Sequence, residues 1–194
     1  MVGQLTGELQ RIEVALRSQG MPLMEYLSPS LSEDRVASRL ASLGLGVPVE
    51  VVEVFGWHNG YTPDTPGRLA GGGNITPRGA GLLTLDQAAD DYYARGPGDL
   101  SVAEIATPSW FPVLKYNTGL VVINCDRSHE EFGLARHWDW WPTDDDEVAV
   151  PIAEVVSWWA HWLETGQWAC TAQGWIDDVD FVELTEIQRR SGLV

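Results

Sequence analysis

Apolar residues recur at helical spacing in two long segments of the chain. The first stripe predicts an amphipathic helix over residues 4–18. The second segment begins at Pro151 and ends at Gly166, which suit the first turn and the stop of a helix. Stripes of this kind are typical of helices that pack on a core. They consist of Leu5, Leu9, Ile12 and Leu16, and of Ile152, Val155, Val156, Trp159, Trp162 and Leu163.

A shorter apolar stripe predicts a helix that begins near residue 33. Its members are Val36, Leu40 and Leu43. Ser30 and Glu33 have the spacing of a capping box, so we expect Ser30 to cap this helix. Gly44 is the expected stop at its C-terminal end.

The segment from Pro48 to Phe55 is ambiguous by pattern. Its valines favour a strand by propensity, but valine recurs every three positions and not every two. Pro48 suits the first turn of a helix, so the pattern as a whole favours a helix. Asn59-Gly60 behind it suits either a helix C-cap or a hairpin turn.

Beyond residue 81 the pattern changes to short β-type runs. Residues 82–85 predict a strand, after which Asp86 is expected to cap a helix that runs to about Ala94. Three further runs and a tight turn at Asn117-Thr118-Gly119 predict a short antiparallel meander. These runs cover residues 110–116, 120–124 and 133–138. A polar tail over residues 177–190 has loose helical spacing and predicts a final short helix.

No repeat and no linker divides the sequence into two cores. Its 194 residues fit one ordinary domain, so we expect a single domain over residues 1–194. Residues 62–81 are rich in Gly, Pro and Thr and predict a loop. The Gly71-Gly72-Gly73 run in it lacks the strand, the helix start and the lysine of a phosphate-binding loop. The mixed helical and β-type runs indicate an α+β fold.

The balance of charge narrows the choice of partner. With 12 basic and 28 acidic residues the chain has a net charge of −16. Such a field repels nucleic acid phosphates and anionic membranes and attracts basic proteins. We therefore expect no nucleic acid and no membrane as partner. The alternative is that the acidity only keeps the protein in solution.

The cysteines and the N-terminal residues bear on the compartment. Cys125 and Cys170 have neither a disulfide framework nor metal-ligand spacing, so we expect two free thiols. Residues 1–20 lack the pattern of a signal peptide. The most apolar stretch, residues 155–163, is too short to span a membrane and contains His161. These features predict a cytoplasmic protein.

Candidate catalytic groups cluster near residue 130. Carboxylates and imidazoles bind metals or transfer protons near neutral pH. No two of these residues keep a recognised ligand spacing, and a solvated turn explains them equally well. Cys125 at the end of an apolar strand is typical of a small core residue, and Ser109 and Ser157 lack a nucleophile elbow. We therefore expect no catalytic site, no metal and no cofactor. The cluster comprises Asp126, His129, Glu130, Glu131, His137 and Asp139.

The segment from Trp138 to Glu147 is the most distinctive in the chain. Residues 124–150 contain eight acids and two arginines, a net charge of −6. Strand alternation would place Trp138 and Trp140 on one face and Trp141 on the other, so at least one ring is expected at the surface. A tryptophan beside carboxylates suits a hot spot for a basic partner; the alternative is that all three indoles pack into the sheet. The expected partner-binding residues are Trp138, Trp140, Trp141, Asp144, Asp145, Asp146, Glu147, Asp126, Glu130 and Glu131.

The order of these landmarks resembles the SUKH superfamily, which includes the yeast Smi/Knr cell-wall regulators and bacterial immunity proteins of polymorphic toxin systems. The resemblance covers residues 33–166, with helical additions at both ends. It implies an α+β fold with a central antiparallel sheet of about four to six strands flanked by helices, and it favours a helix over residues 49–55. The landmarks are Leu43-Gly44, Pro48, Phe55, Asn59-Gly60, Leu83 to Asp86, Trp110-Phe111-Pro112-Val113, Gly119, Gly133 and the helix from Pro151 to Gly166.

The resemblance also implies a function. We expect a non-catalytic protein-binding module, an immunity protein that neutralises a cognate toxin such as a nuclease with a basic active site. The expected partner is a basic protein, and the chain itself is expected to be a monomer or a weak dimer. The first alternative is a housekeeping adaptor like the yeast regulators. The second is a metal-dependent hydrolase built on the cluster near residue 130.

Overall fold

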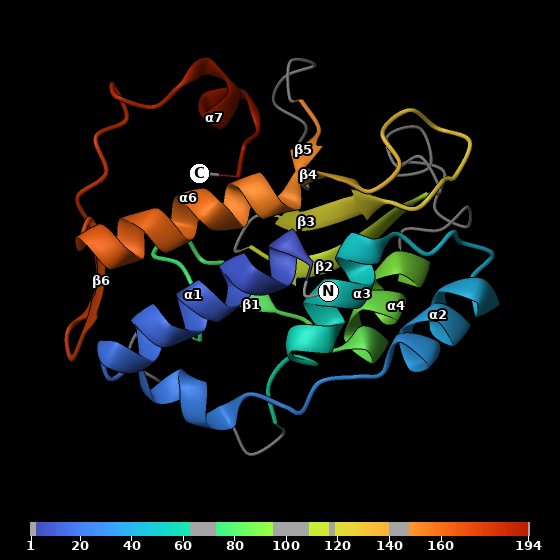
Figure 1. Ribbon diagram of the computed structural model, residues 1–194, viewed down its shortest axis with the longest axis horizontal. Coiled ribbons are helices and arrows are strands. Elements are labelled where there is room, and N and C mark those ends of the chain that lie inside the picture. Colours follow the sequence, from blue (N-terminus) through green and yellow to red (C-terminus); the bar gives the residue numbers. More distant parts are fainter. Residues whose placement is uncertain (1–2, 63–72, 95–108, 117–118, 140–147, 194) are drawn as a thin grey trace.

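The computed structural model describes residues 3–62, 73–94, 109–116, 119–139 and 148–193. Helices precede, flank and follow a set of short strands along the chain (Figure 1). The elements are α1 (Gln4–Ser18), the 3-10 helix η1 (Pro22–Tyr26), α2 (Glu33–Ser42), α3 (Val49–Trp57), β1 (Gly81–Leu82), α4 (Leu85–Ala94), β2 (Trp110–Lys115), β3 (Gly119–Asn124), β4 (Leu134–Asp139), β5 (Val150–Pro151), α6 (Ile152–Thr165), β6 (Trp168–Thr171), β7 (Gly174–Asp177) and α7 (Glu186–Arg190).

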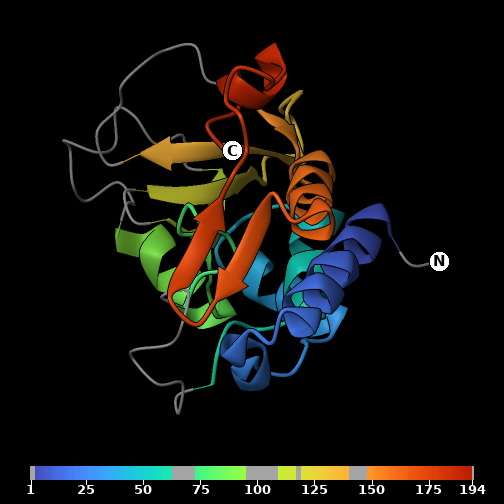
Figure 2. The ribbon, with the colours of Figure 1, turned by 90° about the vertical axis from the view of Figure 1, so that its left-hand side faces the viewer.

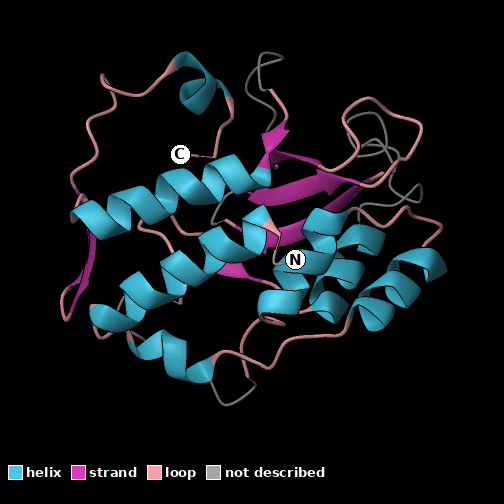
Figure 3. Cartoon of the chain, in the orientation of Figure 1, coloured by secondary structure: helices cyan, strands magenta, loops and turns pink. Residues whose placement is uncertain are grey.

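A five-stranded antiparallel sheet lies at the centre, in the order β1-β2-β3-β4-β5. Each strand therefore pairs with its neighbour in the sequence, as a meander requires. Helices pack around this sheet (Figure 3). The expected α+β fold with a central antiparallel sheet of four to six strands flanked by helices is confirmed.

Strand β3 runs through the middle of the core, and all six of its residues are buried. Burial on both faces explains why this strand is a continuous apolar run without alternation. On one face Phe111 lies opposite Ile123, and the rings of Phe55 and Tyr92 contact Phe111 at centroid distances of 6.4 and 6.0 Å. These contacts attach helices α3 and α4 to the sheet.

Helices α1 and α6 pack side by side over the left half of the molecule in Figure 1. The apolar stripes predicted for both helices are buried. Gly166 ends α6 in the left-handed conformation, at φ +77°, as expected of a helix stop. The helix predicted over residues 49–55 is also confirmed as α3.

Two helix caps differ from the expected residues. Ser32, not Ser30, caps α2 by accepting a hydrogen bond from the backbone N–H of Arg35. The chain before it stays extended because the Leu31 N–H pairs with the carbonyl of Phe55 at 2.9 Å. Helix α4 begins at Leu85, so Asp86 lies inside it and does not cap it.

Thr84 takes the place expected for Asp86. Its hydroxyl accepts from the Gln87 N–H at 3.1 Å, and the Gln87 side chain accepts from the Thr84 N–H at 2.9 Å. This reciprocal pair is a capping box. It shortens the expected strand over residues 82–85 to β1, which ends at Leu82.

A second, two-stranded sheet made of β6 and β7 was not predicted (Figure 2). Trp168 on β6 is fully buried, and its ring lies 4.8 Å from that of Trp162 on α6. Its indole N–H donates to Asp177 Oδ1 at 2.9 Å across the hairpin. The short helix predicted in the tail is α7, capped by Thr185 and Gln188. Within the described residues, no helix is long and apolar enough to cross a membrane.

Candidate partner-binding surface

The turn that joins β3 to β4 carries three of the predicted partner-binding residues: Asp126, Glu130 and Glu131. Asp126 shapes the turn, because its Oδ1 accepts from the backbone N–H of Ser128 at 2.9 Å and from its hydroxyl at 2.7 Å. These hydrogen bonds lower the pKa of the Asp126 carboxyl, which is therefore charged at neutral pH. Glu130 is exposed and Glu131 is half-buried, so the turn presents three carboxyl groups near one another in sequence.

Gly133 closes this turn at the start of β4. Its backbone has a φ of +85° and its N–H donates to the Asn124 carbonyl at 2.9 Å. A Cβ at this position would lie 2.8 Å from Glu50 Oε2 on helix α3. The left-handed backbone favours glycine here, whereas the Glu50 carboxylate is the end of a flexible side chain and could move aside.

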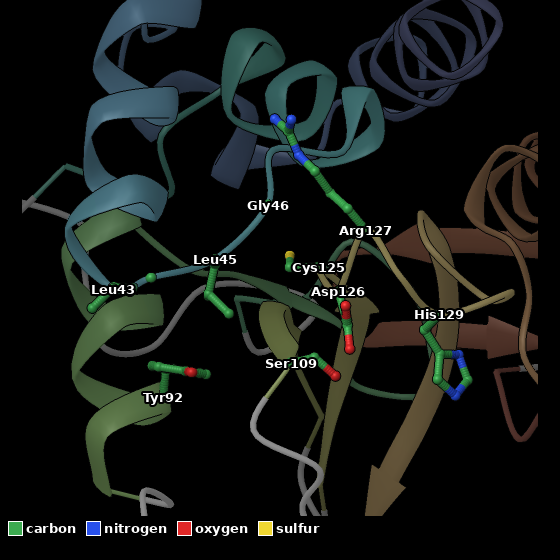
Figure 4. Close-up of a pocket in the computed structure, with 10 residues that line it drawn as sticks. Leu43, Leu45, Gly46, Tyr92, Ser109, Cys125, Asp126, Arg127 and His129 are labelled. Carbon is green, nitrogen blue, oxygen red and sulfur yellow. The ribbon is translucent and has the colours of Figure 1, made fainter.

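A pocket of about 750 Å³ opens beside the acidic turn (Figure 4). It is formed where the connection between α2 and α3 meets the end of β3. The Gly46 N–H donates to the Cys125 carbonyl at 2.8 Å, and a Cβ on Gly46 would lie only 2.6 Å from that oxygen. The pocket is lined by Leu43, Gly44, Leu45, Gly46, Tyr92, Ser109, Cys125, Asp126, Arg127 and His129.

The walls of this pocket differ in character. Leu43, Leu45 and Tyr92 form an apolar and aromatic side, whereas Ser109 and Asp126 lie on the opposite, polar side (Figure 4). The side chain of Arg127 extends toward α3, away from the other labelled side chains. An apolar wall that faces a charged carboxylate suits a partner side chain with a long apolar stem and a cationic end.

Cys125 lies at the base of the turn and is buried, with 1% of its surface exposed. Burial raises the pKa of its thiol to about 12, so the thiol is protonated at neutral pH. The prediction that Cys125 is a small core residue is confirmed. Cys170 is also a free, buried cysteine.

The acid and imidazole residues considered as a catalytic cluster do not all gather. His129 stays in the turn, where its Nδ1 accepts from the Glu131 N–H at 3.2 Å. His137 lies on β4, opposite Val121, and its ring contacts Tyr116 at 5.5 Å. Asp139 is the last residue of β4. In the described part of the chain, no three His, Cys, Asp or Glu side chains are grouped as metal ligands.

Trp138 lies in the core, on β4 opposite Leu120, and 7% of its surface is exposed. Its indole is therefore enclosed by the protein and not presented to a partner. On the same strand the guanidinium of Arg136 stacks over the ring of Trp110 at 4.2 Å. The other residues of the predicted segment lie outside the described residues, so their role stays a prediction. These are Trp140, Trp141, Asp144, Asp145, Asp146 and Glu147.

The length of β4 separates the two parts of the predicted surface. Leu134 follows the acidic turn and Trp138 lies four residues later. At about 3.3 Å per residue, the strand carries the chain roughly 13 Å from the turn before the second part begins. The acidic turn and Trp138 are therefore at opposite ends of one strand. Tyr92, Leu43, Leu45 and Gly46, which only the fold brings to the turn, were not among the predicted site residues.

No protein-family model matches this chain, and no curated protein matches it. The described structure defines an α+β protein in which a charged turn and a partly apolar pocket lie side by side.

Proposed function

We propose that this chain is a non-catalytic protein-binding module of the immunity type, which neutralises a basic toxin by covering its active site. The observation that carries the proposal is the position of the Asp126–Glu131 turn directly beside the pocket lined by Leu43, Leu45 and Tyr92. The net charge of −16 and the resemblance to the SUKH superfamily support it. A nuclease toxin fits this proposal because an active site that attracts phosphates is basic and therefore also attracts an acidic protein surface.

The two parts of the surface have different roles in the proposed complex. Exposed carboxylates attract a basic partner over a distance and mainly increase the association rate. The pocket holds a side chain of the partner, and its apolar wall slows dissociation, because a desolvated anchor carries most of the binding energy. Asp126 belongs to both parts, since it lies in the turn and lines the pocket.

The proposal predicts that a neighbouring gene encodes the cognate toxin domain. The experiment uses that domain, made catalytically inactive, and measures binding rates at several salt concentrations. The triple variant Asp126→Lys, Glu130→Lys and Glu131→Lys should associate at least about tenfold more slowly at low salt and lose most of the salt dependence. The control is Glu25→Lys, Glu33→Lys and Asp34→Lys, which changes three exposed acids elsewhere on the protein by the same total charge. Equal association rates for both triple variants would remove the acidic turn from the binding site.

The pocket is tested through the dissociation rate. Tyr92→Ala should speed dissociation by about tenfold or more if the ring contacts an anchor, since each tenfold corresponds to about 1.4 kcal/mol. Tyr92 also contacts Phe111, so its removal could disturb the core as well as the pocket. Leu43 is only partly buried, and Leu43→Lys serves as a second variant that blocks the pocket but keeps the contact between Tyr92 and Phe111. Normal dissociation of both folded variants would contradict the pocket as an anchor site.

The segment outside the described residues is tested with the same complex. Asp144→Lys, Asp145→Lys and Asp146→Lys should slow association, whereas Trp140→Ala or Trp141→Ala should speed dissociation by an amount equivalent to about 2 kcal/mol. If the chain binds no adjacent toxin but retains several cellular proteins weakly, the housekeeping adaptor replaces the immunity function.

A further inference from the structure

Exposed apolar side chains are concentrated in one stretch near the C-terminus. In the described part of the chain, six large apolar residues are exposed, and four of them lie within residues 176–187, named here the C-terminal arm. The other two, Val14 and Val49, are single residues on separate helices. Single exposed apolar residues are normal, whereas adjacent ones can form an interaction surface. Ile176 lies on β7 and Ile187 on α7, so the adjacent pair is Phe181 and Val182 between them. The four are Ile176 (43% exposed), Phe181 (58%), Val182 (85%) and Ile187 (45%).

The arm is held in place by buried side chains and backbone hydrogen bonds. Val179 and Leu184 are buried and anchor it on either side of Phe181 and Val182. Between these anchors Asp180 forms a turn: its side chain accepts from the Val182 N–H at 2.8 Å and its carbonyl from the Glu183 N–H at 3.0 Å. The turn therefore projects Phe181 and Val182 from the surface.

Arg78 fixes the inner face of the Phe181 ring. Its guanidinium lies 4.2 Å from the ring centroid, and its Nε donates to Asp177 Oδ2 at 3.0 Å. A ring held in one position loses little side-chain entropy when a partner covers its free face. The arm thus has the ordered aromatic residue that binding hot spots favour.

The charge of the arm indicates the chemistry of its partner. Residues 177–186 contain five acids and no basic residue. Arg78 pairs with Asp177 and Arg190 with Glu186, so the excess negative charge beside Phe181 and Val182 comes from Asp178, Asp180 and Glu183. An apolar tip with an acidic border is complementary to an apolar strip bordered by Lys or Arg, and it repels anionic lipid. The acids are Asp177, Asp178, Asp180, Glu183 and Glu186.

We propose that the C-terminal arm is a second docking surface, which binds an amphipathic basic segment of a protein partner. The arm and the β3–β4 turn lie toward opposite ends of the long axis in Figure 1. The proposal therefore goes beyond the acidic turn and its pocket. A partner could occupy both surfaces only by extending along the molecule.

The probe is a synthetic helical peptide of about 18 residues with one leucine face and one arginine face, long enough to fold on contact. Two matched peptides replace every arginine by glutamate or every leucine by serine. The full chain is titrated with each, and binding is followed by calorimetry and by NMR shifts of its amides. Only the leucine–arginine peptide should bind saturably, with the largest shifts within residues 176–187.

Variants locate the binding on the arm. Phe181→Ser with Val182→Ser should weaken the peptide about tenfold or more, whereas Val14→Ser with Val49→Ser removes two other exposed apolar residues and should leave it unchanged. Shifts confined to the β3–β4 turn, or equal affinities for the two double variants, would overturn the proposal. So would a concentration-dependent dimer that Phe181→Ser with Val182→Ser dissociates, since the occupant would then be a second copy. None of these outcomes depends on the binding rates measured with a toxin domain, so the two proposals fail separately.

Discussion

The side chain of Asn59 caps a helix that begins 26 residues after it. Its Oδ1 accepts a hydrogen bond of 2.8 Å from the backbone N–H of Leu85, the first residue of α4. An N–H in the first turn of a helix has no partner within the helix, so this bond satisfies it. The C-cap of α3 is His58, so Asn59-Gly60 lies just after that helix. The hydrogen bond from Leu85 to Asn59 therefore connects the C-terminal end of α3 to the first turn of α4. The sequence pattern allowed only a C-cap or a hairpin turn.

Replacing Asn59 tests this cap. Asn59→Ala should lower the free energy of unfolding by about 1 kcal/mol, the usual cost of losing a helix cap, because the Leu85 N–H is then left without its acceptor. Asn59→Asp keeps an oxygen in the same place and should retain most of the stability. Urea unfolding of the three proteins measures both changes. Equal losses for Ala and Asp would show that the amide group of Asn59 matters and not its oxygen.

Gly60 next to this cap provides a second test, with Gly20 as a matched control. Both glycines have a left-handed backbone, with φ of +68° and +69°. A Cβ at Gly60 would lie 2.7 Å from the Thr84 backbone nitrogen, whereas a Cβ at Gly20 would meet nothing within 4 Å. Gly20→Ala should cost about 1 kcal/mol from the backbone strain alone. Gly60→Ala should cost clearly more, which the same unfolding experiment checks.

The sheet and the long helices could be predicted because their signals are local. Strands β2 and β3 are almost wholly buried, so they are apolar except at their last residues, Lys115 and Asn124. The stripes of α1 and α6 repeat over several turns. The hairpin β6–β7 has four residues per strand, and its position depends on distant groups. The Cys170 N–H, for example, donates at 2.7 Å to the side chain of Gln19, which lies 151 residues earlier in the chain. No local sequence pattern indicates such a hydrogen bond.

The candidate site could be predicted only in part for the same reason. The charge of Asp126, Glu130 and Glu131 can be read from neighbouring positions. The pocket beside them cannot, because it is made by four separate segments that meet only in the fold. Gly46 is an example: its role follows from the 2.8 Å hydrogen bond to Cys125 and not from any motif around it. Trp138 is buried in the sheet, which strand alternation alone could not decide, because it predicted only that at least one of the three indoles lies at the surface.

The two thiols should be unreactive in the folded protein. Burial raises the pKa of both cysteines, that of Cys125 to about 12, so neither is a thiolate at pH 8. A thiol reagent such as Ellman's reagent should label neither cysteine of the native protein at an appreciable rate and should label both in denaturant. Rapid labelling of native Cys125 would show that the β3–β4 turn opens readily.

Glu13 should stabilise the fold at neutral pH and lose this effect in acid. Burial alone would raise the pKa of its carboxyl, but hydrogen bonds from Arg17, Trp57 and His58 outweigh burial and lower it. Because the folded pKa is below the ordinary value of 4.5, the contribution is present above that pH and is lost as the pH falls through the folded pKa. The stability difference between the wild type and Glu13→Gln should therefore shrink on acidification, as urea unfolding at pH 3 to 7 will measure.

Glu50 should behave in the opposite way. Burial raises the pKa of its carboxyl, its own backbone N–H opposes this, and Glu53 adds to it. In acid both the folded and the unfolded chain carry the proton, so ionisation costs nothing. As the pH rises, the unfolded chain loses its proton first, and stability falls until the folded carboxyl has also ionised. Glu50→Gln should therefore raise the free energy of unfolding at pH 7 and leave it unchanged in acid. If the variant is less stable than the wild type at pH 7, the charge on Glu50 must instead stabilise the first turn of α3.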